Sequence, residues 1–410
     1  MLYDIRRIYV KRGKIVVAFT LLVLLTFCAV SCGSADKKGT VETGKGTEIS
    51  EESKAETEQT KEGYAEHIFE IVDLRRNIVD YMRSMSSVEW TPNENFSLNG
   101  DHNTWGVNLN FKKGQKYIGL PYTRAFSGLD DFAKHIENGV YKGPCGSYDT
   151  MPGNNCSSSC DMAWRRYIVS TTEATYTYVP GYGNKTISPV GEYKYPENNR
   201  DTYAIISANS QDVIYEAYTL VKPADAIVKW SDSRSAGHAR MISAEPTVVR
   251  NAQGKINAGR SYLTVIEQTN QLTSSNGKQT TWLVDKIYTF SELLNDGYVP
   301  VTPTVLADGG ELKITLIDGN TAENIGKTLA GTIETNARIT ELEMVVSDAD
   351  GNEAKRCVIE IENGTDKINL RKYSFKLDTA ALPAGKYTYK LTAHTPCFEA
   401  VTLQKIEFEK

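Results

Sequence analysis

The sequence places a cysteine at the predicted start of a helix, where a thiol can act as a nucleophile. Cys156 follows a Gly-Asn-Asn loop in which Asn155 is suited to cap a helix, and helix-forming residues come after it. The unpaired amides and the macrodipole at a helix N-terminus stabilise an anion. A thiol in that position has a lowered pKa, as a nucleophile requires. Cys160 lies one turn further along, and we expect it to face the core or a disulfide partner.

A nucleophilic cysteine needs a base, and the base needs a third residue to orient it. Among five histidines, His238 follows Ala-Gly and opens an apolar strand, so we expect its ring to point into a cleft. On the next predicted strand, residues 262–268, Glu267 shares one face with two apolar residues and can accept the other imidazole proton. Gln268 takes that role if the strand phase slips by one residue. The residues therefore predict an arrangement of Cys156, His238 and Glu267.

Three stretches carry a resemblance to the NlpC/P60 cysteine peptidases. Residues 118–122, Ile-Gly-Leu-Pro-Tyr, resemble the Gly-x-Pro-Tyr segment of that family. Residues 155–158, Asn-Cys-Ser-Ser, resemble its Asp-Cys-Ser-Gly nucleophile motif. Residues 222–228, followed by Gly-His at 237–238, resemble its Pro-Gly-Asp and Gly-His elements. The resemblance covers about residues 110–270, and it implies a papain-like α+β fold.

The resemblance also implies an activity, which is hydrolysis of amide bonds in the peptides of peptidoglycan, with no metal or cofactor. Cys156 would attack the carbonyl, His238 would move the proton and Glu267 would orient the imidazole. The implied substrate-binding residues are Tyr122, Asn155 and Ser157. Two positions depart from the family pattern. Asn155 stands where many members have an Asp that helps to bind a free substrate amine, and Ala224 stands where Gly is usual.

Residues 1–32 have the pattern of an export signal. A basic start precedes the apolar run 15–30, which is shorter than the roughly 20 residues that a permanent membrane helix needs. The run ends in Ala-Val-Ser-Cys-Gly, which resembles a bacterial lipobox with Cys32 as the lipidated residue. Ordinary cleavage near Ser31 is the alternative. Residues 33–63 are too polar to form a core and predict a flexible tether. We therefore expect a lipid-anchored protein on the extracytoplasmic face of the cell membrane.

The remaining chain predicts two folded domains. A leading helix over 64–90 begins an α+β domain, residues 64–299, which contains the peptidase-like stretch. The Pro-Val-Thr-Pro segment 300–303 predicts a linker. Short alternating runs then predict an all-β immunoglobulin-like sandwich over 300–410, acting as a spacer or binding module. Its expected strands lie at 312–317, 342–346, 357–361, 373–377 and 387–391.

Composition and cysteine count limit the function classes. The 410 residues include 46 Lys and Arg against 51 Asp and Glu, and this acidic balance excludes a dedicated nucleic-acid binder. Two other classes stay open, a surface lipoprotein that reuses the fold only for binding and a thiol acyltransferase. Without the signal cysteine and Cys32, five cysteines remain, so at least one stays a free thiol. Cys357 can pair with Cys397, and the alternative for Cys156 is a disulfide with Cys145 or Cys160.

Overall fold

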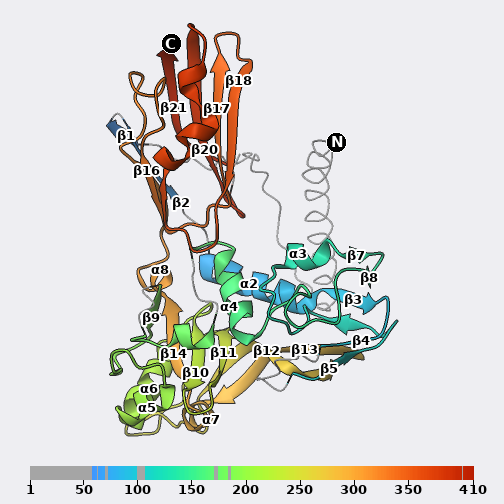
Figure 1. Ribbon diagram of the computed structural model, residues 1–410. Helices are drawn as coiled ribbons and strands as arrows, with labels where there is room; N and C mark the ends of the chain where they lie inside the picture. The colour runs from blue at the N-terminus through green and yellow to red at the C-terminus, as the bar shows by residue number, and fades with distance from the viewer. Residues whose placement is uncertain are drawn as a thin grey trace, which may run out of the picture. The chain divides into compact units, whose positions relative to one another are not determined.

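The computed structural model is a mixed α/β structure, rich in sheet and with few helices (Figure 1). The predicted signal segment, with its lipidation residue Cys32, lies outside the described residues, as does the tether up to residue 57. In the part of the chain that the structure describes, no helix is both long and apolar enough to span a membrane. The residues described are 58–61, 63–69, 73–98, 107–169, 174–182, 186–398 and 400–410.

A sheet of ten strands carries the catalytic candidates. Its order is β7-β8-β3-β6-β13-β12-β11-β10-β14-β9. Four central strands pair antiparallel with their sequence neighbours, and they are β10 (Ala226–Ser231), β11 (Ala236–Ile242), β12 (Tyr262–Ser275) and β13 (Lys278–Thr289). The others are β3 (Glu89–Pro92), β6 (Tyr117–Ile118), β7 (Ile136–Glu137), β8 (Val140–Tyr141), β9 (Ile187–Pro189) and β14 (Val299–Pro303).

Helices lie between these strands along the chain. They are α2 (Leu74–Ser87), α3 (Leu129–Ala133), α4 (Cys156–Arg165), α5 (Thr202–Ser207), α6 (Gln211–Thr219), α7 (Phe290–Asn295) and α8 (Thr304–Ala307), with the 3-10 turn η1 (Thr175–Tyr178). Helix α4 packs against β11, β12 and α2. A separate hairpin consists of β4 (Phe96–Leu98) and β5 (Leu109–Phe111).

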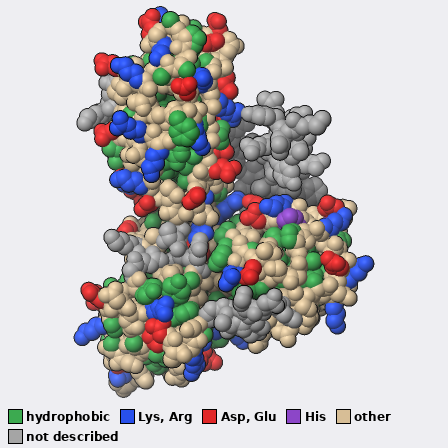
Figure 2. Space-filling model, in the orientation of Figure 1, with side chains coloured by type: hydrophobic (Ala, Val, Ile, Leu, Met, Phe, Trp, Pro, Cys, Tyr) green, Lys and Arg blue, Asp and Glu red, His purple; other side chains and the backbone are tan. Residues whose placement is uncertain are grey.

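The C-terminal strands form two more sheets, and one of them also includes the N-terminal strands β1 and β2. One has the order β18-β17-β20-β21, and the other β1-β2-β15-β16-β19. The bounds are β1 (Glu58–Lys61), β2 (Tyr64–Phe69), β15 (Leu312–Ile317), β16 (Thr332–Thr335), β17 (Glu341–Asp348), β18 (Glu353–Glu360), β19 (Lys367–Asn369), β20 (Lys386–His394) and β21 (Val401–Glu409). Short helical turns η2 (Leu370–Tyr373), α9 (Ser374–Leu377) and η3 (Thr379–Ala381) precede β20. On the face seen in Figure 2, acidic and basic side chains are intermixed over the C-terminal strands.

The predicted leading helix over 64–90 is wrong in its first part. Residues 64–69 form β2, which pairs antiparallel with β15, and the helix begins only at Leu74. Inward and outward residues alternate along β2, as in a strand. Asp73, just before the helix, has a φ of 56°, a left-handed conformation that breaks any continuous helix. The end of the predicted tether is also a strand, because β1 pairs with β2.

The predicted linker at 300–303 is a buried strand. These residues belong to β14, which lies between β10 and β9, so the expected domain boundary after residue 299 falls inside the strand. Proline is tolerated there because the carbonyl of Pro300 still accepts hydrogen bonds, from the Val190 N–H at 3.1 Å and the Tyr193 hydroxyl at 2.7 Å. Burial of the Val299 and Val301 side chains explains why this segment is a strand of the sheet and not an exposed linker.

One expected C-terminal strand is also wrong. Residues 373–377 are helical, in η2 and α9, although their apolar residues alternate. Phe375 in this run is 77% exposed, so the alternation does not correspond to a buried face. The Ser374 hydroxyl accepts a hydrogen bond from the Leu329 N–H, which fixes the turn locally. The other expected strands of this region are confirmed as β15, β17, β18 and β20.

Candidate active site

Helix α4 begins at Cys156 and is capped by Asn155, as the sequence predicts. The Asn155 side-chain oxygen accepts hydrogen bonds from the N–H groups of Ser157 and Ser158, at 3.1 and 3.0 Å. The Ser158 hydroxyl in turn accepts from the Asn155 N–H at 2.8 Å, completing a capping box. The Ser157 hydroxyl also donates to the Asn155 oxygen. Asn155 and Ser157 both line the cavity, but the Asn155 oxygen already serves the helix cap.

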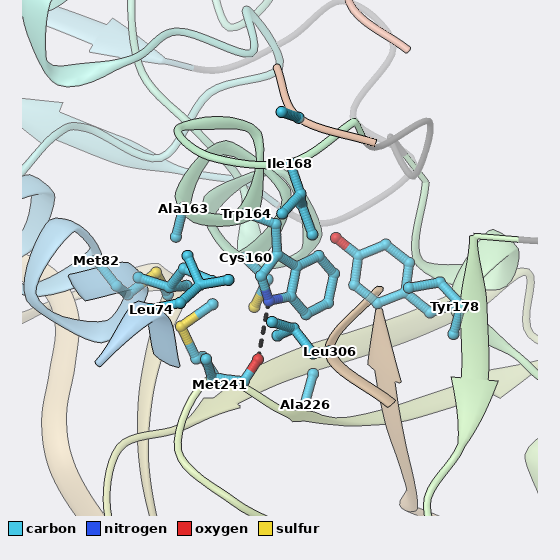
Figure 3. Close-up of a cluster of buried hydrophobic side chains, with 14 of the residues drawn as sticks. Leu74, Met82, Cys160, Ala163, Trp164, Ile168, Tyr178, Ala226, Met241 and Leu306 are labelled. Carbon is cyan, nitrogen blue, oxygen red and sulfur yellow. Dashed lines mark hydrogen bonds between the residues drawn. The ribbon is translucent and has the colours of Figure 1, made fainter. Parts of the chain in front are cut away.

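A buried cluster fixes α4 in place (Figure 3). Cys160, Trp164 and Ile168 are fully buried. The Trp164 ring packs against Tyr178, with 5.3 Å between ring centroids, and the cluster also contains Met82 of α2 and Met241 of β11. The indole N–H of Trp164 donates to the carbonyl of Ala224 at 2.8 Å. Because these contacts tie the helix to both α2 and the sheet, the position of the Cys156 sulfur follows from the core rather than from a surface loop.

The motif around Ala224 is structural in this chain. Ala224 has a φ of 72°, in the left-handed region where glycine is preferred, so the backbone conformation is kept without the usual Gly. The carboxylate of Asp225 accepts from the Lys222 N–H at 2.7 Å and from Arg75 of α2 at 2.6 Å. Asp225 is buried and lies at the start of β10, so it anchors the strand that runs beside His238.

The Cys156 thiol lies among hydrogen-bonding groups. Its sulfur is 3.9 Å from the Thr175 hydroxyl and 4.0 Å from the Tyr122 hydroxyl. Burial raises the pKa of Cys156, but the charge of His238 and hydrogen bonds from His238, the Ala239 N–H and Thr175 lower it to about 7. The balance therefore favours the thiolate more than in a free cysteine, whose pKa is about 8.5.

His238 stands between the thiol and Glu267. Its Nε2 lies 2.5 Å from Glu267 Oε2, which leaves Nδ1 to face the sulfur. Burial lowers the pKa of His238, but the Cys156 thiolate and the hydrogen bonds to Cys156 and Glu267 raise it to about 9. The raised pKa of the base and the lowered pKa of the thiol together favour a thiolate–imidazolium pair near neutral pH.

The glycine before His238 is required by packing. A Cβ at Gly237 would lie 2.5 Å from the Lys229 carbonyl oxygen and 2.6 Å from the Trp230 ring. Those distances are far below van der Waals contact, and both neighbours are fixed in β10. Only glycine therefore allows β11 to approach β10 closely enough to hold His238 where it lies.

Glu267 is held by three donors. Besides His238, the Nε of Arg240 donates to Oε2 at 2.9 Å and the Tyr288 hydroxyl donates to Oε1 at 2.6 Å. Burial raises the pKa of Glu267, but hydrogen bonds and charges from His238, Arg240 and Tyr288 lower it to about 2. The carboxylate is thus ionised at neutral pH and fixed in orientation, which suits the third member of a triad.

Neither Gln268, the alternative third residue, nor Cys160, one turn along the helix, takes part in this arrangement. Gln268 donates to the Leu120 carbonyl at 2.8 Å and to the Thr281 hydroxyl, so it does not approach His238. Burial and the nearby Cys156 charge raise the pKa of Cys160 well above its usual range. All five described cysteines are free thiols, so neither the pairing of Cys357 with Cys397 nor a disulfide to Cys156 is formed.

Tyr122 is positioned to donate to an oxyanion. Its hydroxyl faces the Cys156 sulfur, and burial followed by the Cys156 charge raises its pKa well above the usual range. The phenol therefore keeps its proton throughout the working range of the thiolate. A carbonyl oxygen that becomes negative during attack by the sulfur would lie near this hydroxyl and near the positive end of the helix macrodipole.

These residues line a cavity of about 820 Å³, within the range typical of ligand sites. Aromatic side chains form much of its wall, including Tyr122, Tyr148, Tyr176, Trp230, Tyr288 and Tyr298. Sequence reasoning missed Thr175, Lys229 and Arg240. Arg240 follows His238 by two residues on one strand, and residues two apart on a strand share a face. This spacing could have predicted Arg240 from the sequence. Among the described residues, no cluster of three His, Cys, Asp or Glu residues is arranged to hold a metal ion.

Comparison of the chain with models of protein families, with curated proteins and with solved structures finds no match in any of the three.

Proposed function

We propose that the chain is a cysteine peptidase or amidase of NlpC/P60-like type, lipid-anchored on the extracytoplasmic face of a cell membrane, that hydrolyses amide bonds in cell-wall peptides. The proposal includes a papain-like arrangement for the region around the site and an immunoglobulin-like sandwich for the C-terminal strands. The observation that carries it is the contact of a helix-start thiol with an imidazole whose other nitrogen lies 2.5 Å from the buried carboxylate of Glu267.

The geometry supports attack by a thiolate followed by hydrolysis. The Cys156 sulfur forms a bond to the substrate carbonyl carbon, and the oxygen takes the negative charge beside the Tyr122 hydroxyl. The imidazolium of His238 then gives its proton to the leaving amine as the C–N bond breaks, which leaves a thioester. Water next loses a proton to His238 and attacks the thioester, so the acid and the free thiol are released. Glu267 keeps the imidazole oriented throughout.

The cell wall as substrate rests on sequence features. The resemblance over residues 110–270 implies peptidoglycan peptides, and the lipobox-like sequence ending at Cys32 implies an anchor outside the membrane. The size and partly aromatic lining of the cavity suit a short peptide segment. No step of this chemistry needs a metal or cofactor.

Thiol reactivity tests the proposal without a guess about substrate. Iodoacetamide alkylation of Cys156 in the full chain is followed against pH by peptide mass. We expect a midpoint near pH 7, shifted upward in His238→Ala. His394→Ala is the matched control, because His394 also lies near a glutamate, Glu343, but belongs to the β17–β20 pair. The proposal would be contradicted by a midpoint at about pH 8.5, as for an ordinary thiol, or by the same midpoint in His238→Ala as in wild type.

Products separate hydrolysis from its alternatives. We expect digestion of purified peptidoglycan fragments to give two products whose summed mass exceeds the substrate by one water. The rate should rise with a midpoint near pH 7 and fall with one near pH 9, because the thiolate and the imidazolium are both required. Transfer of the acyl group to another amine would instead indicate a transferase. A protein that binds the fragments but does not cleave them, although its thiol is reactive, would indicate a binding protein.

A further inference from the structure

A second group of basic residues lies on the cavity face of the sheet, next to His238. Lys229 of β10 is directly opposite His238 in the β10–β11 ladder, and Arg240 follows His238 by two residues. Directly opposed residues, and residues two apart on one strand, share a face of a sheet. Consistent with that register, all three residues line the cavity.

Lys229 is the unbalanced charge of this cavity. Apart from the Cys156–His238 pair, whose charges balance, the basic side chains among the described lining residues are Arg124, Lys229 and Arg240, and the acidic one is Glu267. Arg240 forms an ion pair with Glu267 at 2.9 Å. Arg124 forms one with a neighbouring aspartate at 3.0 Å. Within the described part of the chain, Lys229 forms no ion pair with a carboxylate within 4 Å. The charges of Asp296 and Glu267 act on it from farther away, and burial lowers its pKa and so opposes its charge.

Two buried donors beside Lys229 also lack partners among the described residues. They are Nη1 of Arg240 and the hydroxyl of Tyr298. The Arg240 guanidinium is stacked between the rings of Tyr288 and Tyr298, at 3.7 and 4.2 Å from their centroids. The Lys229 ammonium lies 4.9 Å from the Tyr298 centroid. Because both atoms are buried, they act on a ligand through the electrostatic potential and not by contact. Donors without acceptors leave uncompensated positive ends beside Lys229, which favours an anion in this part of the cavity.

We propose that Lys229 binds a carboxylate of the substrate, with Arg240 and Tyr298 behind it reinforcing the positive potential. This inference deepens the proposed peptidase function and rests on it. One unbalanced positive charge matches a singly charged carboxylate better than a doubly charged phosphate. Opposed residues of a strand pair have Cβ atoms about 5 Å apart, so the carboxylate binds within one side-chain length of His238. It therefore belongs to a residue that adjoins the scissile amide.

Two alkylating agents of nearly equal shape test this site. Iodoacetate carries a carboxylate where iodoacetamide carries a neutral amide, and both react with the Cys156 thiolate. The readout is the rate of Cys156 alkylation by iodoacetate divided by the rate by iodoacetamide, measured in the full chain at pH 7.5 and low salt. In Lys229→Met, which keeps the apolar stem against Tyr298, we expect that ratio to fall about tenfold. In Lys229→Arg, which restores the charge, we expect most of the ratio to return.

Arg124→Gln is the matched control. Arg124 lines the same cavity, but its charge is already paired with Asp149 and half exposed, so we expect less than a twofold change in the ratio. Thermal unfolding of each variant verifies that the fold is kept. An unchanged ratio in Lys229→Met, with Cys156 still fast toward iodoacetamide, would refute the carboxylate site and leave the peptidase proposal standing. Slow reaction of wild-type Cys156 with both reagents would refute the peptidase proposal itself.

Discussion

Replacing Glu267 by Gln tests whether a buried carboxylate keeps the catalytic imidazole charged. Glutamine has nearly the same shape, and its amide oxygen can still accept a hydrogen bond from His238 Nε2. The negative charge is lost, however, and the Arg240 guanidinium is left without its counter-charge. We therefore expect the pKa of His238 to fall and, because its charge stabilises the thiolate, the pKa of Cys156 to rise.

The size of the effect follows from the carboxylate. Its partners lower the pKa of Glu267 from 4.5 to about 2, in spite of burial. At about 1.4 kcal/mol per pKa unit, this amounts to about 3.5 kcal/mol in favour of the ionised form. Three donors share that energy, so about 1 kcal/mol is assigned to His238, or about one pKa unit. If the pKa of Cys156 rises by a similar amount from about 7, its thiolate fraction at pH 7 falls about fivefold.

The assay is the pH dependence of iodoacetamide alkylation at Cys156, compared between wild type and Glu267→Gln. We expect the midpoint to move up by about one pH unit. Glu343→Gln is the control, since it removes a carboxylate 3.4 Å from His394, which belongs to a sheet other than that of the site. A Glu267→Gln profile that coincides with wild type, in a variant with an unchanged thermal unfolding temperature, would refute the idea that this carboxylate sets the state of the Cys–His pair.

Further predictions concern the oxyanion donor, the strand approach, the buried ion pair and acid stability. Tyr122→Phe removes the hydroxyl near the sulfur, and we expect kcat to fall about 100-fold with little change in KM, measured on the peptide substrate. Gly237→Ala forces β10 and β11 apart. We expect the free energy of unfolding, measured in urea, to fall by more than about 2 kcal/mol. Asp225→Ala leaves the Arg75 guanidinium without its counter-charge, and we expect the free energy of unfolding, measured in the same way, to fall by about 3 kcal/mol. The lowered pKa of Glu267 stabilises the fold above pH 4.5, and this contribution should disappear as the pH falls toward 2. Circular dichroism during acid titration measures the transition. Glu267→Gln should lack the part of the transition that comes from this carboxylate.

Local chemistry made parts of the site predictable. The helix start at Cys156 follows from the capping groups of Asn155 and Ser158, which lie within one turn of the cysteine. The face of Glu267 follows from alternation along β12, which continues as far as Gln268 because the bulge before it lies in the partner strand. There Asp285 has a φ of 54°, and the register against β12 shifts beside it.

Other parts depend on contacts between distant segments. The grouping of Lys229, Arg240 and Tyr298 requires the register of β10 on β11 and the position of the chain after α7, which no local pattern encodes. Residues 64–69 become a strand because β15 is available to pair with them. The strand at 299–303 is hidden in sequence because its two prolines resemble a linker, although the segment pairs with β10 on one side and β9 on the other.

The pairing of β2 with β15 has a consequence for how this protein reaches its native state. Glu66 and Thr315, which face each other in that ladder, are 249 residues apart in the chain. Closing so long a loop is slow, because the ordering entropy is lost before the contact forms. During synthesis, β2 has no partner until the chain has been made as far as β15, which ends at Ile317 of 410 residues. The C-terminal strands are therefore not an appendage that can be deleted, since β15, β16 and β19 complete a sheet that β1 and β2 begin.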